Sequence, residues 1–139
     1  MIVLDTNVLS EVVKPQPARS VLDWLARQDR SALFTTTITQ AEMLYGLERL
    51  PDGRRKQALD QAVNAMFAED FEGHVLNFDQ HAAAAYARLH HQRKTLGLST
   101  SQSDTMIAAI AHSIGAAVAT RNIADFQTAG VAVINPWEA

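Results

Sequence analysis

The sequence predicts a single α/β domain in which a parallel sheet of about five short strands is covered by helices on both faces. Short apolar runs rich in β-branched residues alternate along the chain with longer helical patterns, as expected of parallel strands joined by crossover helices. The length of 139 residues suits one domain. There is no internal repeat, low-complexity tract or linker, so one domain is expected to span residues 1–139.

Strands and helices are expected along the whole chain, from the spacing of apolar residues. The expected strands are residues 2–4, 33–35, 75–77, 117–120 and 131–134. The expected helices are residues 8–13, 18–28, 39–50, 55–69, 80–96 and 104–114, with a short turn or helix at 123–128.

Local signals predict where several helices begin or end. Pro15 ends the first helix, and Pro17 suits the first turn of the second. Thr39 and Glu42 have the Thr-x-x-Glu spacing of a capping box, which predicts that the third helix begins there. Gly97 is expected to end the long helix 80–96.

Composition and charge exclude several classes of function. The chain has no cysteine, which excludes disulfides, thiolate metal sites and cysteine nucleophiles and fits a reducing cytosol. No apolar run approaches the ~20 residues that cross a membrane, and the start of the chain has no signal segment. A cytoplasmic protein is therefore expected. The net charge of -3 argues against binding nucleic acid by electrostatics alone, but permits acidic residues offset by divalent cations.

Two groups of basic residues are expected to lie on solvated helix faces. One surrounds the start of the predicted helix 55–69, and the other lies near the end of the helix 80–96. The first contains Arg49, Arg54, Arg55 and Lys56, and the second contains Arg88, His90, His91, Arg93 and Lys94.

Acidic and amide side chains are expected to meet at one edge of the sheet. Asp5 follows the first strand, Glu42 lies in the first turn of the helix after the second strand, and Asp104 opens a later helix. Asn122 follows the fourth strand, and Asp125 comes three residues later. Because the carboxyl ends of parallel strands share one edge, residues from distant parts of the chain should converge there.

Most of these residues also have a purely structural interpretation. Asp5 could merely cap the next helix, and Glu42 could be only the last residue of its capping box. Asn122 could cap the segment 123–128 with Asp125 as its box partner.

Asp104 fits a structural role less well. Ile107, Ala108 and Ala111 lie three, four and seven residues further on, so Asp104 falls on the inward stripe of its helix. An unpaired buried carboxylate is strongly unfavourable, and no Lys or Arg in the segment is obviously placed to pair with it. A bound cation would satisfy Asp104.

The available donors favour a hard cation. The histidines show no zinc-binding spacing, and oxygen ligands alone select Mg²⁺ or Mn²⁺. Carboxylates around such a metal are suited to hydrolysing phosphodiester bonds, because the metal activates a bound water and offsets charge on the phosphate. The chain has no motif for a serine, threonine or lysine nucleophile.

The ordered set of motifs resembles the PIN-domain family, and more closely the VapC-type toxins of its FitB-like subgroup. The resemblance covers nearly the whole chain and implies the PIN-like three-layer α/β/α sandwich. Its motifs are Leu4-Asp5-Thr6-Asn7, Glu42, Ser103-Asp104-Thr105-Met106-Ile107-Ala108-Ala109, Ala119-Thr120-Arg121-Asn122 with Asp125-Phe126, and Asn135-Pro136-Trp137.

This resemblance implies an Mg²⁺-dependent endoribonuclease that is the toxin of a type II toxin–antitoxin pair. It also implies a homodimer, and an antitoxin that blocks the site and binds operator DNA. An acidic site is a good target for arginine, so we expect the antitoxin to place a basic side chain among Asp5, Glu42 and Asp104. RNA is the implied substrate, and no membrane partner is expected.

The family pattern makes Asp5 and Asp104 the metal ligands and Glu42 a further acid. Many relatives have Asp where this chain has Asn122, so Asp125 is the candidate substitute. The remaining expected site residues are Thr6, Asn7 and Arg121, the last as a guide for RNA.

Two other functions stay open. A phosphatase with Asp5 as nucleophile would have a second Asp two residues later, where this chain has Asn7. The alternative to an enzyme is a non-catalytic or weakly catalytic metal-binding regulatory module that works with a DNA-binding partner. A receiver domain of that kind would have a Lys after its last strand, where this chain has Asn135 and Pro136. Metal-dependent RNA cleavage separates enzyme from module.

Overall fold

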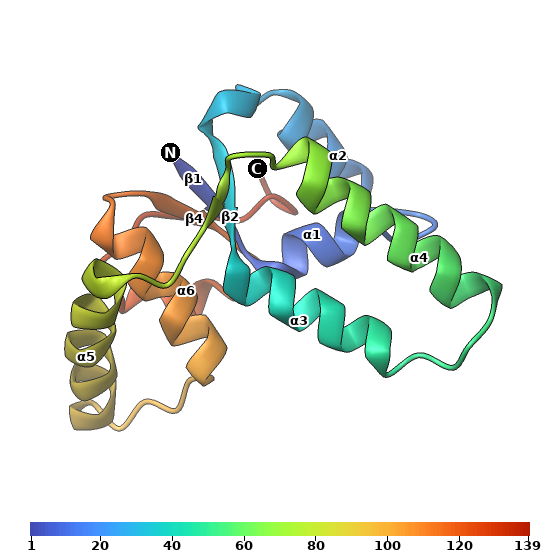
Figure 1. Ribbon diagram of the computed structural model, residues 1–139. Helices are drawn as coiled ribbons and strands as arrows, with labels where there is room; N and C mark the ends of the chain where they lie inside the picture. The colour runs from blue at the N-terminus through green and yellow to red at the C-terminus, as the bar shows by residue number, and fades with distance from the viewer.

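The computed structural model describes residues 1–139 and has a five-stranded sheet at its centre (Figure 1). The strands are β1 (Ile2–Leu4), β2 (Leu33–Thr36), β3 (Val75–Leu76), β4 (Ala117–Ala119) and β5 (Val133–Ile134). They lie in the order β3-β2-β1-β4-β5, and every neighbouring pair is parallel. The strand β1 is therefore central, with its carboxyl end among the ends of the other four.

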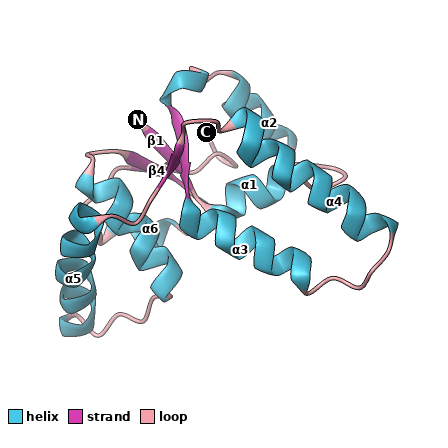
Figure 2. Cartoon of the chain, viewed as in Figure 1, coloured by secondary structure: helices cyan, strands magenta, loops and turns pink.

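Helices cover both faces of this sheet, as Figure 2 shows. The predicted α/β/α sandwich is confirmed. The helices are α1 (Thr6–Val12), α2 (Arg19–Ala26), α3 (Thr37–Glu48), α4 (Arg54–Ala65), α5 (Gln80–Thr95), α6 (Gln102–Ser113) and α7 (Ile123–Gln127), with a 3-10 turn η1 (Arg30–Ala32) and a π-helical turn η2 (Met66–Asp70).

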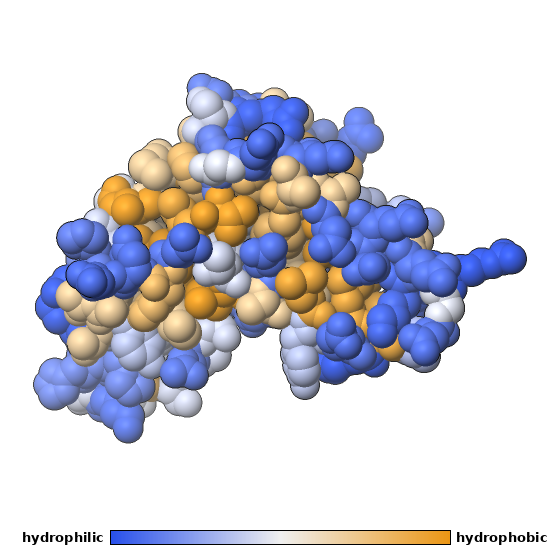
Figure 3. All heavy atoms as spheres, viewed as in Figure 1, coloured by the Kyte–Doolittle hydropathy of each residue, from blue (hydrophilic) through white to orange (hydrophobic).

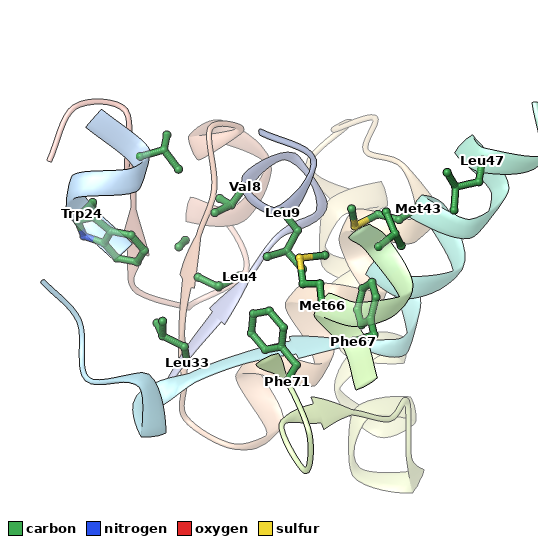
Figure 4. Packing of buried hydrophobic residues seen from close by; sticks show 13 residues of the cluster. Leu4, Val8, Leu9, Trp24, Leu33, Met43, Leu47, Met66, Phe67 and Phe71 are labelled. Carbon is green, nitrogen blue, oxygen red and sulfur yellow. The ribbon is translucent and has the colours of Figure 1, made fainter. Parts of the chain in front are cut away.

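Alternating side chains of the sheet divide the core into two parts. Leu4 points into one cluster with α1 to α4 and η2, whereas its neighbour Val3 joins a second cluster with α5, α6 and α7. The first cluster is built from large side chains, among them Leu9, Phe67 and Phe71 (Figure 4). The second is rich in alanine, which lets α5 and α6 pack closely. Both faces of β1 are buried, as its apolar sequence predicts.

The start of helix α3 differs from the prediction. Thr36, at the end of β2, is the N-cap: its Oγ1 accepts a hydrogen bond of 3.1 Å from the backbone N–H of Thr39. The predicted capping box of Thr39 and Glu42 is therefore wrong. The strand runs directly into the helix, so Thr39 is already in the first turn and Glu42 is free for other contacts.

Other helix boundaries also differ from the prediction, and α1 begins at Thr6 instead of residue 8 because Asp5 caps it. Ser101 caps α6 by accepting a 3.0 Å hydrogen bond from the backbone N–H of Asp104, so Asp104 is the third residue of the helix rather than the first. The predicted helix 55–69 ends as an α-helix at Ala65. It continues as the π-helical turn η2, in which the N–H of Phe71 bonds to the carbonyl of Met66.

None of the helices is both long enough and apolar enough to serve as a membrane span.

The Thr36 cap predicts a measurable loss of stability. Thr36→Val removes the hydroxyl while keeping the side-chain volume, and should lower the free energy of unfolding by about 1 kcal/mol in urea titrations. Thr37→Val is the matched control, because the Thr37 side chain is half-buried and caps no helix. Equal effects of the two substitutions would show that Thr36 does not cap α3.

Candidate active site at the carboxyl edge of the sheet

Asp5 lies at the junction of β1 and α1 and is 1% exposed. Its Oδ1 accepts a 2.7 Å hydrogen bond from the backbone N–H of Thr6, so Asp5 does cap helix α1, as its structural interpretation required. The cap occupies only one carboxylate oxygen. The other oxygen is held by side chains from elsewhere in the chain.

Thr120 and Asn7 hold this second oxygen. The hydroxyl of Thr120 donates to Asp5 Oδ2 at 2.8 Å, and the amide of Asn7 donates to the same atom at 3.0 Å. Strand register explains why Thr120 lies there. Leu4 is paired with Ala119, so the next residue of each strand, Asp5 and Thr120, emerge side by side at the edge.

Glu42 reaches the same edge from helix α3. Its Oε1 accepts a 2.7 Å hydrogen bond from the hydroxyl of Thr6, and that hydroxyl lies 3.0 Å from the hydroxyl of Thr39. The side chain of Thr6 therefore links the carboxylate of an exposed residue on α3 to the helix that Asp5 caps.

Asp104 and Asp125 complete a group of four acidic side chains. Both are half-buried, Asp104 in the first turn of α6 and Asp125 in α7. We refer to Asp5, Glu42, Asp104 and Asp125 as the carboxylate cluster. In Figure 3 the surface is hollowed between the part formed by α5 and α6 and the part formed by α3 and α4.

The charges of the carboxylate cluster influence one another. Burial raises the pKa of Asp5 to about 6, the negative charges of Asp104 and Glu42 add to the rise, and the hydrogen bond from Thr120 opposes it. Burial also raises the pKa of Asp104, with contributions from Asp125 and Glu42. The negative charges around Asp5 and Asp104 thus make it less favourable for these two carboxyls to ionise.

No lysine or arginine forms a salt bridge with the carboxylate cluster. Its carboxylates take part in none of the four salt bridges of the protein, which join Lys14 to Glu11, Arg19 to Asp23, Arg30 to Asp70 and Lys56 to Asp52. The donors are oxygens, which suits Mg²⁺ or Mn²⁺. No three acidic or histidine side chains gather closely enough to surround a metal by themselves. Mg²⁺ is commonly bound by one or two carboxylates and keeps several waters, so the residues fit such a site.

Arg93 corrects the prediction about the second basic group. Its side chain does not lie on a solvated helix face, since the residue is only 2% exposed. It lies near Asp104 and Asp125, and its positive charge opposes the rise in the pKa of Asp104. No Lys or Arg forms a salt bridge with Asp104, as expected from the sequence, but the packing of α5 on α6 brings the charge of Arg93 close enough to influence it.

Asn122 and Arg121 lie at the rim of the site. Asn122 is at the N-cap position of α7, but its exposed side chain makes no capping hydrogen bond, so its predicted capping role is wrong. Its backbone N–H donates to Thr120 Oγ1 at 3.0 Å. The backbone N–H of Arg121 donates to Asn7 Oδ1 at 3.2 Å, and its guanidinium lies 4.9 Å from the centre of the Trp137 ring.

Sequence reasoning missed three residues that shape this site: Thr39, Arg93 and Thr120. Thr120 had a usable signal, because it ends the fourth predicted strand just as Asp5 follows the first. The other two had none, since Thr39 was assigned to a capping box and Arg93 to a basic surface.

The raised pKa of Asp5 predicts that this residue destabilises the metal-free fold at neutral pH. Between the ordinary value of 3.8 and about 6, the folded state binds a proton more tightly than the unfolded state. Stability therefore falls as pH rises through this range, by up to about 3 kcal/mol. With a chelator present, Asp5→Asn should raise the free energy of unfolding at about pH 7.5, and the gain should vanish near about pH 4.

Asp52→Asn is the matched control, because the side chain of Asp52 is fully exposed. It should change stability little at either pH. If Asp5→Asn is instead less stable than wild type in chelator at neutral pH, the hydrogen bonds of the carboxylate outweigh the free-energy cost of burying its charge.

Comparison with known proteins identifies the fold. The PIN domain family matches residues 2–130. VapC ribonuclease Y4jK of Sinorhizobium fredii is 42% identical over 138 residues, covering 99% of both chains. Toxin FitB of Neisseria gonorrhoeae is 39% identical over 137 residues, again covering 99% of both. A solved structure of FitAB bound to an IR36 DNA fragment aligns with a TM-score of 0.91 at 39% identity, covering 99% of this chain and 96% of the other.

These relatives span this chain almost from end to end, and the predicted resemblance is confirmed. The chain belongs to the PIN-domain family, where its relatives include VapC ribonuclease Y4jK and Toxin FitB.

Proposed function

We propose that this protein is an Mg²⁺-dependent endoribonuclease and the toxin of a toxin–antitoxin pair. The observation that carries the proposal is the carboxylate cluster: a buried Asp5 shares one edge of the sheet with three further acids, and none of them has a salt-bridge partner. The names of the relatives, a VapC ribonuclease and a toxin, supply the substrate class and the biological role.

In this proposal Asp5 and Asp104 hold the metal, with Mn²⁺ as a possible substitute for Mg²⁺. When bound, the metal supplies activation of a water and neutralisation of charge on the phosphodiester. Thr120, Asn7 and the N–H of Thr6 fix the carboxylate of Asp5 in one orientation through three hydrogen bonds. These contacts fix its orientation before substrate arrives, which favours catalysis.

Glu42 is the proposed general base. Its Oε1 is engaged by the Thr6 hydroxyl, and its Oε2 has no hydrogen-bond partner within the protein. That oxygen would take a proton from the attacking water. Its exposure keeps it in contact with solvent, from which the water comes and to which the proton returns.

The amide at position 122 sets the expected number of metals. An amide oxygen binds a hard cation or a water but adds no negative charge. With Asn122 exposed at the rim, we propose one tightly held metal and a supporting role for Asp125 through water or through Asn122. A second metal would need the charge of the substrate phosphate.

The proposed partners are an antitoxin and, through it, operator DNA. A groove of about 440 Å³ runs beside Thr6 and Glu42 between α1, α3 and α4, with an apolar wall that includes Met43, Leu47 and Val63. An antitoxin segment in this groove would carry a basic side chain to the carboxylate cluster, where an arginine matches carboxylate geometry. The solved FitAB complex with DNA supports such an assembly. We also propose that the toxin is a homodimer.

The proposal predicts a graded response to substitutions in the cluster. Asp104→Asn should abolish both Mn²⁺ binding in titration calorimetry and metal-dependent RNA cleavage, since it removes a ligand charge. Asp125→Asn should lower cleavage but leave one Mn²⁺ bound, and Asn122→Asp should tighten binding. The exposed control Asp52→Asn should change neither.

Equal damage from Asp125→Asn and Asp104→Asn would make Asp125 a primary ligand and overturn this ranking. Tight Mn²⁺ binding by wild type without cleavage of any RNA would favour the regulatory module over the enzyme.

Arg121 is proposed to guide RNA toward the cluster. The guanidinium lies over the Trp137 ring and the backbone N–H of Arg121 donates to Asn7, so both ends of the residue are held at the rim. Arg121→Ala should weaken RNA binding in a catalytically inactive Asp104→Asn background and reduce the salt slope by about one. The Arg54-Arg55-Lys56 group is a weaker candidate for the same role, so the control is Arg19→Ala, on an exposed residue of α2. Unchanged affinity and slope for Arg121→Ala would remove it from the RNA path.

A further inference from the structure

Arg93 is the one lysine or arginine side chain that the fold buries. Its Nη1 donates hydrogen bonds to the hydroxyls of Thr100 at 2.9 Å and Thr105 at 3.0 Å. Its Nη2 donates to the backbone carbonyl of Asp125. The Nε has no hydrogen-bond partner. The guanidinium thus joins three segments: the loop after α5, the first turn of α6, and α7.

Stability does not account for this arrangement. Arg93 forms no salt bridge, its Nε–H is buried without a partner, and burial lowers its pKa by disfavouring the charged form. Replacing a buried ion pair by apolar side chains of similar volume is often neutral or stabilising, so burial of a charge is weak evidence for stability. A residue with such poor pairing is better explained by the groups around it.

Those groups are two members of the carboxylate cluster. Asp104 directly precedes Thr105, and Asp125 itself provides the carbonyl that Arg93 binds. The two carboxylates repel each other, and the charge of Arg93 opposes that repulsion. Arg93 donates to hydroxyl and carbonyl oxygens rather than to the carboxylates, so it offsets their charge without occupying the oxygens that a cation needs.

We propose that Arg93 is a positioning residue for the site: it fixes α7 against α6 so that Asp104 and Asp125 stay together at the carboxyl edge. This role rests on the proposed function of the carboxylate cluster. The planar guanidinium suits it because its donors point in several fixed directions, whereas the single amine of a lysine at position 93 would not reach all three acceptors in that geometry.

The test compares Arg93→Met with Arg88→Met, a control on the exposed face of the same helix. In metal-free protein, backbone amide exchange in α7 should become about tenfold faster in Arg93→Met, with β1 and β4 unchanged. The melting temperature should stay near that of wild type. The Mn²⁺ affinity should fall between about tenfold and a hundredfold, as for residues that orient metal ligands. Arg88→Met should behave as wild type in all three measurements.

The proposal is overturned if backbone amides of α7 exchange in Arg93→Met at the wild-type rate. It is also overturned if Arg93→Met binds Mn²⁺ more tightly than wild type, because Arg93 would then act only as a charge that repels the metal. If Arg93→Met does not fold, Arg93→Lys takes its place. In Arg93→Lys the amides of α7 should exchange faster than in wild type, by less than in Arg93→Met. The proposal is overturned if both the α7 exchange rate and the Mn²⁺ affinity of Arg93→Lys equal those of wild type. Amide exchange and Mn²⁺ binding are measured without RNA, so absence of cleavage by wild type would count against the nuclease and leave these results valid.

Discussion

The gathering of carboxylates at one edge of the sheet, around the buried Asp5, is the constraint on which the rest of this structure depends. Asp5 ends the central strand of a parallel sheet, where burial and neighbouring acids raise its pKa to about 6. A fold selected for stability alone would not place four acids at one edge without cations. The hydrogen bonds that hold the carboxylates of Asp5 and Glu42 come from the start of α1 and from Thr120, just after β4.

Threonine side chains make many of the hydrogen bonds at the carboxyl edge of the sheet. Thr6, Thr36, Thr39 and Thr120 line the carboxyl edge, and each donates or accepts a hydrogen bond that fixes a helix start or an acidic side chain. A hydroxyl is small enough to be buried at a strand end, and its donor and acceptor can serve two partners. Thr120 shows this directly, since it donates to Asp5 and accepts from the N–H of Asn122.

The two faces of the sheet contribute different parts of the site. Helices α1 and α3, packed on the cluster of large side chains, supply the Asn7 and Thr6 contacts and Glu42. Helices α6 and α7, packed with α5 on the alanine-rich face, supply Asp104 and Asp125. Close helix packing on this second face also brings Arg93 to the two acids, because alanine at the α5–α6 contact keeps the helices near each other.

The sequence alone determined the class of fold and predicted which acids would meet at the carboxyl edge of the sheet. Short apolar runs and helical spacing of apolar residues are local patterns, and acids that follow parallel strands must share one edge. What the sequence did not determine was the partner of each side chain. Glu42 looked like half of a capping box until Thr36 proved to be the cap, and Arg93 looked solvated until α5 packed on α6. Only the tertiary structure decided these contacts. Hydrogen bonds between distant segments depend on strand register and helix packing, and the local pattern of residues does not determine either of them.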